Sequence, residues 1–106
     1  MVEYKDKIAR IEKQDLPGWD FLLKAIHAVL TRADEDYVLE QVKEKFGSLR
    51  YYYRFSKPLP DDYRKSVMDI VVTLSDMAPY YCQQCGAVSQ ISEKNGWLTT
   101  RCGKCS

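Results

Sequence analysis

Four cysteines are the residues of this 106-residue chain whose spacing indicates chemistry most clearly. They form two Cys-x-x-Cys pairs, separated by the sixteen residues 86–101. Thiolates are preferred ligands of structural zinc, and each pair can place two sulfurs on one side of a tetrahedron. Gly86, directly after the second thiol, permits the tight backbone that such a knuckle needs. The sequence therefore predicts one structural Zn²⁺ held by Cys82, Cys85, Cys102 and Cys105.

Disulfides and free thiols are the alternatives to a metal site. Two disulfides would need an oxidising compartment, and residues 1–7 contain no apolar signal region. Thioredoxin-like redox chemistry uses one Cys-x-x-Cys pair beside a βαβ unit, whereas here two pairs flank a hairpin pattern. We therefore favour zinc in a cytoplasmic protein, in a structural role because no open coordination position is predicted.

The segment between the cysteine pairs has the pattern of a β-hairpin. Residues 87–92 and 97–101 are strand-like runs, and Asn95-Gly96 between them is a strong signal for a two-residue turn. Such a hairpin brings the two pairs together and gives a zinc-ribbon-like tail over residues 82–106. Residues 1–81 are expected to form an α+β body on which this tail packs, since Tyr80-Tyr81 leave almost no linker before Cys82.

Residues suited to catalysis are scarce. The chain has no Gly-rich phosphate-binding loop, no nucleophile elbow and no His-Glu-x-x-His segment, and it has one histidine, His27. His27 lies at the edge of an apolar stripe, where a histidine is more often a partner of the core than a base. Turns and helix starts explain the acidic pairs Asp34/Asp36 and Asp61/Asp62. We therefore expect no enzyme, and a metal-dependent nuclease or hydrolase is the least favoured alternative.

The overall charge does not indicate a nucleic-acid-binding protein. Lys and Arg total 16 against 15 acidic residues, and four zinc-bound thiolates with one divalent ion would lower the net charge of +1 by about two. The charge is uneven, however. Residues 12–42 have three basic and seven acidic residues (net −4), and residues 43–65 have seven basic and three acidic ones (net +4). These segments either pair within the fold or present a basic surface. No apolar run approaches the roughly 20 residues of a membrane span, so we expect a soluble protein.

Two amphipathic helices are predicted. The first begins near Pro17, with Asp15 or a neighbour as its cap, and the second is capped by Asp61 or Asp62 and stops at Pro79. Apolar residues three and four apart predict a core-facing stripe on each. The first stripe is Trp19, Leu22, Leu23, Ile26, Val29 and Leu30, and the second is Tyr63, Val67, Ile70, Val71, Leu74 and Met77. A short amphipathic helix is also expected within residues 2–13.

Residues 37–55 combine an ambiguous half with a clear one. Leu39, Val42 and Phe46 fit a helix closed by Gly47, but alternate residues of the same segment fit a strand. Residues 49–55 alternate at a period of two in strand-favouring residue types, which predicts a strand. Its inner face should carry Leu49, Tyr51, Tyr53 and Phe55, and its outer face Arg50, Tyr52 and Arg54.

That outer face is a candidate binding surface. Alternating arginine and tyrosine can grip phosphates and stack on bases. The simpler interpretation is a solvated face whose arginines pair with Glu40 or Glu44 across a hairpin. The candidate contacts, including those of the tail, are Arg50, Tyr52, Arg54, Lys94, Trp97, Arg101 and Lys104.

Three stretches of the sequence resemble a known group of proteins. They are Gly18-Trp19 at a helix start, residues 41–52, and the ending with two cysteine pairs around Gly96-Trp97-Leu98. They are similar to small uncharacterised bacteriophage and prophage proteins with a VKEKFG-x-LR-aromatic run and a C-terminal metal knuckle followed by Gly-Trp. The resemblance covers most of the chain from residue 18 onward and implies a hairpin at residues 42–52, which favours a strand for residues 37–45. This chain ends with Cys105 where relatives often have histidine, and both residues bind zinc.

Together these features predict an α+β protein in which two amphipathic helices pack on a small antiparallel sheet or hairpin, with the zinc-ribbon-like hairpin at the C-terminus. The group that it resembles has no established activity, so the resemblance implies a phage or prophage context and no mechanism. We expect a non-catalytic interaction protein whose partner is a host or phage protein, since Tyr, Trp and Arg are common interface anchors. Inhibition of a host defence nuclease, such as CRISPR or another immune system, and redirection of transcription are examples. A nucleic-acid-binding accessory protein is the alternative.

Overall fold

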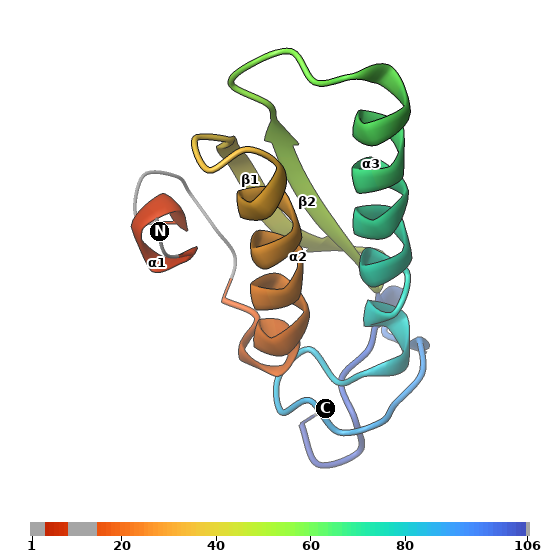
Figure 1. Cartoon of the computed structure of the whole chain (residues 1–106). Helices are drawn as coiled ribbons and strands as arrows, with labels where there is room; N and C mark the ends of the chain where they lie inside the picture. The colour runs from red at the N-terminus through yellow and green to blue at the C-terminus, as the bar shows by residue number, and fades with distance from the viewer. Residues whose placement is uncertain (1–3, 9–14, 106) are drawn as a thin grey trace.

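The computed structural model of the chain describes residues 4–8 and 15–105, and of Lys94 the backbone alone. In Figure 1, α2 and α3 stand side by side in front of the β1–β2 hairpin, and the tail with the cysteines lies at one end of both helices. The elements are α1 (Tyr4–Ile8), η1 (Pro17–Trp19), α2 (Asp20–Ala33), β1 (Val38–Lys45), β2 (Ser48–Arg54), α3 (Asp61–Ser75), η2 (Ala78–Tyr80), β3 (Ser92–Lys94) and β4 (Trp97–Thr99). The predicted α+β class is confirmed, with two main helices, a β1–β2 hairpin and a C-terminal β3–β4 hairpin.

Helix α2 forms the centre of the core. Pro17 opens a 3-10 turn just before it, where a proline costs no hydrogen bond. The predicted stripe of α2 is buried except for Val29, which is half-buried against the core. The expected cap, Asp15 or a neighbour, is Leu16 for the 3-10 turn and Trp19 for α2, and neither residue makes a side-chain capping hydrogen bond. Leu16 is buried among the core residues instead, so apolar packing fixes the start of this helix.

A β-bulge explains why residues 37–45 resembled both a helix and a strand. β1 and β2 pair antiparallel, but the register shifts between Leu39 and Gln41, which leaves Glu40 as an extra residue in β1. Leu39 and Val42 are therefore both buried on the inner face although they are three residues apart. The strand interpretation is confirmed, and the helical spacing came from the bulge.

The β1–β2 hairpin closes through a turn that is unusual for its residue types. Phe46 and Gly47 both have positive φ angles, 55° and 79°, as in a type I′ turn. Glycine accepts this conformation, whereas an aromatic residue in it is strained. The Gly47 N–H donates to the Glu44 carboxylate (2.7 Å), which fixes the turn, while the Phe46 ring is 60% exposed.

A polar network joins α2 to the hairpin inside the core. His27 Nδ1 lies 2.7 Å from the Tyr37 hydroxyl, which lies 2.7 Å from the Tyr51 hydroxyl. Thr31 adds a further hydroxyl beside the His27 ring. His27 is therefore a hydrogen-bonded partner of the core, as predicted.

Helix α3 packs less deeply than predicted. Val67 and Val71 are buried and Leu74 is half-buried, but Tyr63, Ile70 and Met77 are exposed. The reason is geometric, since α3 lies at the edge of the body and, among the elements that the structure describes, packs mainly against α2 and β2. The predicted aspartate cap is also wrong. The N-cap is Pro60, which makes no side-chain capping bond, and Asp61 and Asp62 lie inside the first turn, where their charges suit the helix dipole.

The N-terminal helix α1 is fastened over the aromatic network. Lys7 Nζ donates to the Tyr37 carbonyl (2.6 Å) and lies 4.3 Å from the centre of the Tyr37 ring. The Tyr4 ring packs on His27 and Tyr51. The remainder of the helix expected within residues 2–13 lies outside the described residues. None of the helices formed by residues 4–8 and 15–105 combines the length and apolar character that spanning a membrane requires.

Candidate metal centre

The four cysteines converge at the end of the chain beneath α2 and α3. Their Sγ atoms all lie within 4.8 Å of one another. Sulfurs bound tetrahedrally to one zinc at about 2.3 Å are about 3.8 Å apart, and the Sγ atoms of Cys85 and Cys102 are 3.6 Å apart. All four residues are free thiols, and this separation far exceeds the roughly 2 Å of a disulfide. The four cysteines are placed to bind one structural zinc ion, as the sequence predicts.

Backbone hydrogen bonds shape the first knuckle, residues 82–86. The Cys82 N–H donates to the Ala87 carbonyl (2.7 Å), and the Gly86 N–H donates to the Cys82 carbonyl (2.8 Å). Gly86 has a φ of +83°, which side chains disfavour, so its predicted role in the turn is confirmed. The Cys102 N–H donates to Cys82 Sγ (3.3 Å) and so ties the second knuckle to the first.

The first knuckle rests on the start of the helical body through a contact that the sequence did not reveal. The Gly18 N–H donates to the Gln83 carbonyl (2.8 Å), and Trp19 Nε1 donates to the Tyr81 carbonyl (2.9 Å). A Cβ at Gly18 would collide with the Cys82 carbonyl oxygen. The knuckle therefore docks on η1 as well as following α3. In the sequence, the one sign of this contact is the glycine directly after Pro17, where a residue with a side chain would not fit.

A buried glutamine and threonine join the two knuckles, and sequence reasoning missed both. The Thr100 hydroxyl, which is fully buried, accepts the Gln83 N–H (3.1 Å) and donates to Gln83 Oε1 (3.2 Å). A polar pair buried in so small a module must be satisfied internally. These bonds join the chain just after Cys82 to the chain just before Cys102, and so connect the two cysteine pairs.

The hairpin between the knuckles is shorter than predicted. Asn95 and Gly96 form its turn with φ angles of 52° and 83°, which confirms the turn prediction. Strand pairing covers only β3 and β4, and before them the chain makes a single bridge between Tyr81 and Val88. The strand predicted over residues 87–92 is therefore wrong for most of its length. Val88 is exposed, so no core holds that segment in a ladder.

The four thiols differ in their readiness to ionise. Burial opposes ionisation of Cys82, but backbone N–H groups, that of Cys102 foremost, outweigh it and lower the Cys82 pKa to about 6. The Lys104 N–H lowers the pKa of Cys102. Hydrogen bonding to Cys102 raises the pKa of Cys105 to about 12, since neighbouring thiolate charge opposes another ionisation. A divalent cation removes this conflict because it stabilises all four thiolates together. The donor set therefore fits zinc.

The predicted binding residues of β2 lie where the sequence placed them. Arg50, Tyr52 and Arg54 are exposed on the outer face of the hairpin. The same face of β1 carries Lys43 and Lys45, which sequence reasoning missed because the bulge left that strand ambiguous. Arg54 Nε lies 3.7 Å from the Glu40 carboxylate, so one of the expected pairs between the basic and acidic segments is present. A surface pair of this kind contributes little to stability.

The predicted binding residues of the tail are also exposed. Trp97 begins β4 and is 76% exposed. Arg101 directly precedes the second knuckle, residues 102–105, and Lys104 lies within it. The side chain of Lys94 is outside the described part of the structure.

A hollow of about 490 Å³ lies between the turns of the two hairpins. We call it the hairpin cleft. It is lined by Glu44, Lys45, Phe46, Gly96, Trp97 and Leu98. The two hairpins meet beside it, because a Cβ at Gly47 would lie 2.8 Å from Ile91 Cγ1. The cleft thus joins a predicted binding residue of the tail, Trp97, to Lys45 at the end of β1.

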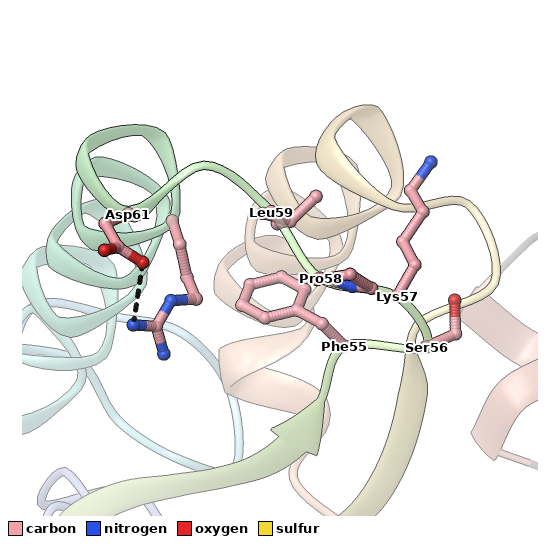
Figure 2. A pocket seen from close by; sticks show the side chains of 7 residues that line it. Phe55, Ser56, Lys57, Pro58, Leu59 and Asp61 are labelled. Carbon is pink, nitrogen blue, oxygen red and sulfur yellow. Dashed lines mark ion pairs between the residues drawn. The ribbon is translucent and has the colours of Figure 1, made fainter.

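A second hollow, of about 510 Å³, lies between the end of β2 and the start of α3 (Figure 2). Its apolar lining comes from Phe55, Pro58 and Leu59. The Lys57 side chain extends away from the Phe55 ring in Figure 2. Asp61 forms a 3.7 Å ion pair with Arg64 across one helical turn. These contacts describe an open apolar recess beside a surface ion pair.

Asp34, one of the acidic residues considered for catalysis, has structural partners. Its carboxylate accepts the Ser56 N–H (2.6 Å), the Ser56 hydroxyl (2.8 Å) and the Asp36 N–H (3.1 Å). Burial opposes ionisation of Asp34, but these hydrogen bonds outweigh it and lower the pKa. Asp34 therefore ties the end of α2 to the loop after β2.

No family model matches the chain, and no curated protein or solved structure does either. The resemblance to phage and prophage proteins accordingly rests on the sequence runs themselves.

Proposed function

We propose that this zinc-binding chain is a non-catalytic interaction protein that docks on another protein through the hairpin cleft. The observation that carries the proposal is the pair of exposed aromatic residues, Phe46 and Trp97, on the two facing turns. Aromatic side chains that line a recess are frequent centres of protein interfaces.

In this proposal the zinc holds one wall of the cleft in place. β3 and β4 have three residues each, and an isolated two-stranded hairpin is at best marginally stable in water. The tail buries few side chains of its own, chiefly Cys82, Gln83 and Thr100. The free energy of metal binding would therefore supply the order that this small core cannot.

The strain at Phe46 supports a role in binding. Asparagine, aspartate or glycine would suit the first position of this turn, yet the chain carries a bulky aromatic residue there with a φ of 55°. The ring gains little from burial, since it is 60% exposed. Backbone strain concentrates at functional sites, where another advantage offsets its cost. Contact with a partner would provide that advantage.

The cleft chemistry suggests what the partner presents. Phe46, Trp97 and Leu98 would receive an apolar side chain, while Lys45 at the rim, 5.7 Å from the centre of the Phe46 ring, would pair with an acidic neighbour. We therefore propose a partner segment with an apolar residue next to an acidic one.

The resemblance to phage and prophage proteins suggests the source of that partner. In such a setting a small binding protein acts on a host machine by occupying its surface. A host defence nuclease, CRISPR or another immune effector, and the transcription apparatus are the candidates that we propose. Occupying such a surface needs no catalytic residue in this chain.

The test compares capture of a partner by matched variants of the zinc-loaded chain. Phe46→Asn removes the ring but relieves the turn strain, so it should bind less while folding more stably. Trp97→Ala removes the aromatic side chain on the opposite wall of the cleft. Val72→Ser is the control, because it removes an apolar side chain that is about as exposed as Phe46 but lies on α3, away from the cleft. After identification from a bacterial lysate, the partner is purified and its affinity for each variant is measured.

We expect Phe46→Asn and Trp97→Ala to weaken binding at least about tenfold, the range of interface hot spots, and Val72→Ser to bind like the parent chain. Equal capture by all variants would contradict the proposal. A homodimer that dissociates on Trp97→Ala would also contradict it, because the cleft would then be occupied by a second copy.

A further inference from the structure

The outer face of the β1–β2 hairpin concentrates positive charge, of which the cleft proposal uses only Lys45. We call this surface the basic face, and it consists of Lys43, Lys45, Arg50, Tyr52 and Arg54. Arg54 has a carboxylate partner in Glu40. Among the residues that the structure describes, no carboxylate forms an ion pair with Lys43, Lys45 or Arg50.

The strand register adds a repulsion to this charge. Lys43 and Arg50 are directly opposite each other in the ladder, and like charges at opposed positions destabilise a strand pair. The neighbouring Glu44 does not lie between them, since it is opposite Leu49 and its carboxylate accepts the Gly47 N–H. An anion bound across the two strands would relieve this repulsion.

An aromatic ring lies among these cations. Alternate residues of a strand share a face, so Arg50, Tyr52 and Arg54 run along β2 as cation, aromatic ring and cation. Tyr52 is exposed, and Lys43 Nζ lies 5.9 Å from the centre of its ring. A flat exposed ring between cations offers a stacking surface as well as charge.

We propose that the basic face binds single-stranded nucleic acid, with Lys43, Lys45 and Arg50 contacting phosphates and Tyr52 stacking on a base. The cations match the charge of the backbone, and a base must be free of its helical stack before it can lie on Tyr52. A duplex has the negative charge but its bases are not free to stack on Tyr52. An acidic peptide has the negative charge but carries no base. Both features of the basic face are used only by an unpaired strand.

The experiment is fluorescence anisotropy of the zinc-loaded full chain with a labelled mixed-sequence oligonucleotide, single-stranded or annealed to its complement. Lys43→Glu/Arg50→Glu reverses the opposed pair and leaves Lys45, which also lines the cleft, unchanged. Arg32→Glu/Lys65→Glu is the matched control, because it makes the same charge change at exposed positions on α2 and α3. Tyr52→Ala tests stacking without changing charge. Zinc content and circular dichroism verify that each variant is folded.

We expect the charge-reversed variant to lose at least about tenfold in affinity and the control to change less than about twofold. Tyr52→Ala should lose about fivefold or more for the single strand, as expected for one stacked base, and much less for the duplex. With three phosphate contacts, the logarithm of the association constant for the single strand should fall with the logarithm of the salt concentration at a slope of about −2.

Three results would overturn the proposal. They are undetectable binding at low salt, equal losses in the charge-reversed and control variants, and equal affinity for a glutamate-rich peptide of the same charge. Failure of this proposal is distinguishable from failure of the cleft proposal, because Lys43, Arg50 and Tyr52 do not line the cleft and the variants here leave Phe46 and Trp97 unchanged.

Discussion

At the scale of single residues, Gly18 links the metal centre to the helical body. Its N–H donates to the Gln83 carbonyl inside the first knuckle, and its Cα lies so close to the knuckle that a side chain has no room. The order of the tail therefore depends on a residue more than sixty positions before the first cysteine. The conformational tolerance of glycine is secondary here, because what matters is the absence of a Cβ.

Gly18→Ala should weaken both folding and metal binding. The added Cβ would collide with the Cys82 carbonyl oxygen and lie 2.6 Å from the Gly86 nitrogen, so η1 and the knuckle must move apart. We expect a loss of about 1–3 kcal/mol in the free energy of unfolding and weaker zinc retention against a competing chelator. Gly103→Ala is the control, because a Cβ there meets nothing within 4 Å. Equal stability of the two variants in urea unfolding would show that the contact at Gly18 is not tight.

At the scale of elements, the His27–Tyr37–Tyr51 network is where α1, α2 and the hairpin meet. Two hydrogen bonds of 2.7 Å connect the three side chains, and Lys7 of α1 fastens to the Tyr37 backbone. Burial raises the pKa of Tyr37 to about 12 and raises that of Tyr51 further. The folded state therefore favours protonated tyrosines in this network.

Alkaline pH should destabilise the fold through these tyrosines. A tyrosine in the unfolded chain ionises near pH 10, and Tyr37 in the folded chain ionises near 12. The stabilisation is therefore complete below about pH 10 and is lost as the pH rises through about 12. Urea unfolding at a series of alkaline pH values should show a falling midpoint. Tyr37→Phe should flatten that fall, and Tyr80→Phe, which changes an exposed ring, should not. The same slope in all three chains would show that the network is not its source.

The elements differ in how far the sequence predicts them. The stripe of α2 and the alternation in β2 are strong because each packs on the core along one continuous face, although Val29, Tyr53 and Phe55 are only half-buried. β1 was ambiguous because the bulge at Glu40 converts a period of two into a spacing of three. The burial of the α3 stripe was overestimated. Periodicity shows which residues share one side of a helix, but it does not show how much of that side other elements cover. Tyr63, Ile70 and Met77 share that side but extend past the narrow contact with α2 and β2.

In the metal site too, features set by local sequence could be predicted and contacts between distant residues could not. Cysteine spacing is a local property, so the four ligands and the glycine after Cys85 could be predicted. The docking of Gly18 on the knuckle and the Gln83–Thr100 pair depend on contacts between distant parts of the chain. Neither glutamine nor threonine has a spacing that identifies such a role.

At the scale of the whole molecule, two parts are stabilised by different means. The body buries a continuous cluster around α2, whereas the tail buries little and relies on its cysteines. They are joined by the Gly18–Gln83 backbone hydrogen bond and by the close approach of Gly47 to Ile91, while the Trp19–Tyr81 hydrogen bond fixes the last residue of the body just before the tail. Loss of the metal should therefore loosen the tail first.

Hydrogen exchange with and without a strong chelator tests that difference. We expect amides of residues 82–105 to lose protection on metal removal, while those of α2 and β2 remain protected. Cys105→Ser should reproduce the pattern without a chelator. Uniform loss of protection throughout the chain would show that the body cannot fold without the tail, and an unchanged pattern would show that zinc has no structural role.

The most direct test of the metal centre is the zinc content of the chain purified under reducing conditions, measured by native mass spectrometry beside Cys82→Ser. Four sulfurs within 4.8 Å of one another predict one zinc per parent chain. Cys82 is buried and accepts the Cys102 N–H, so its replacement should abolish stoichiometric zinc. A folded parent chain that carries no metal, or a Cys82→Ser variant that keeps one zinc per chain, would contradict the four-cysteine site.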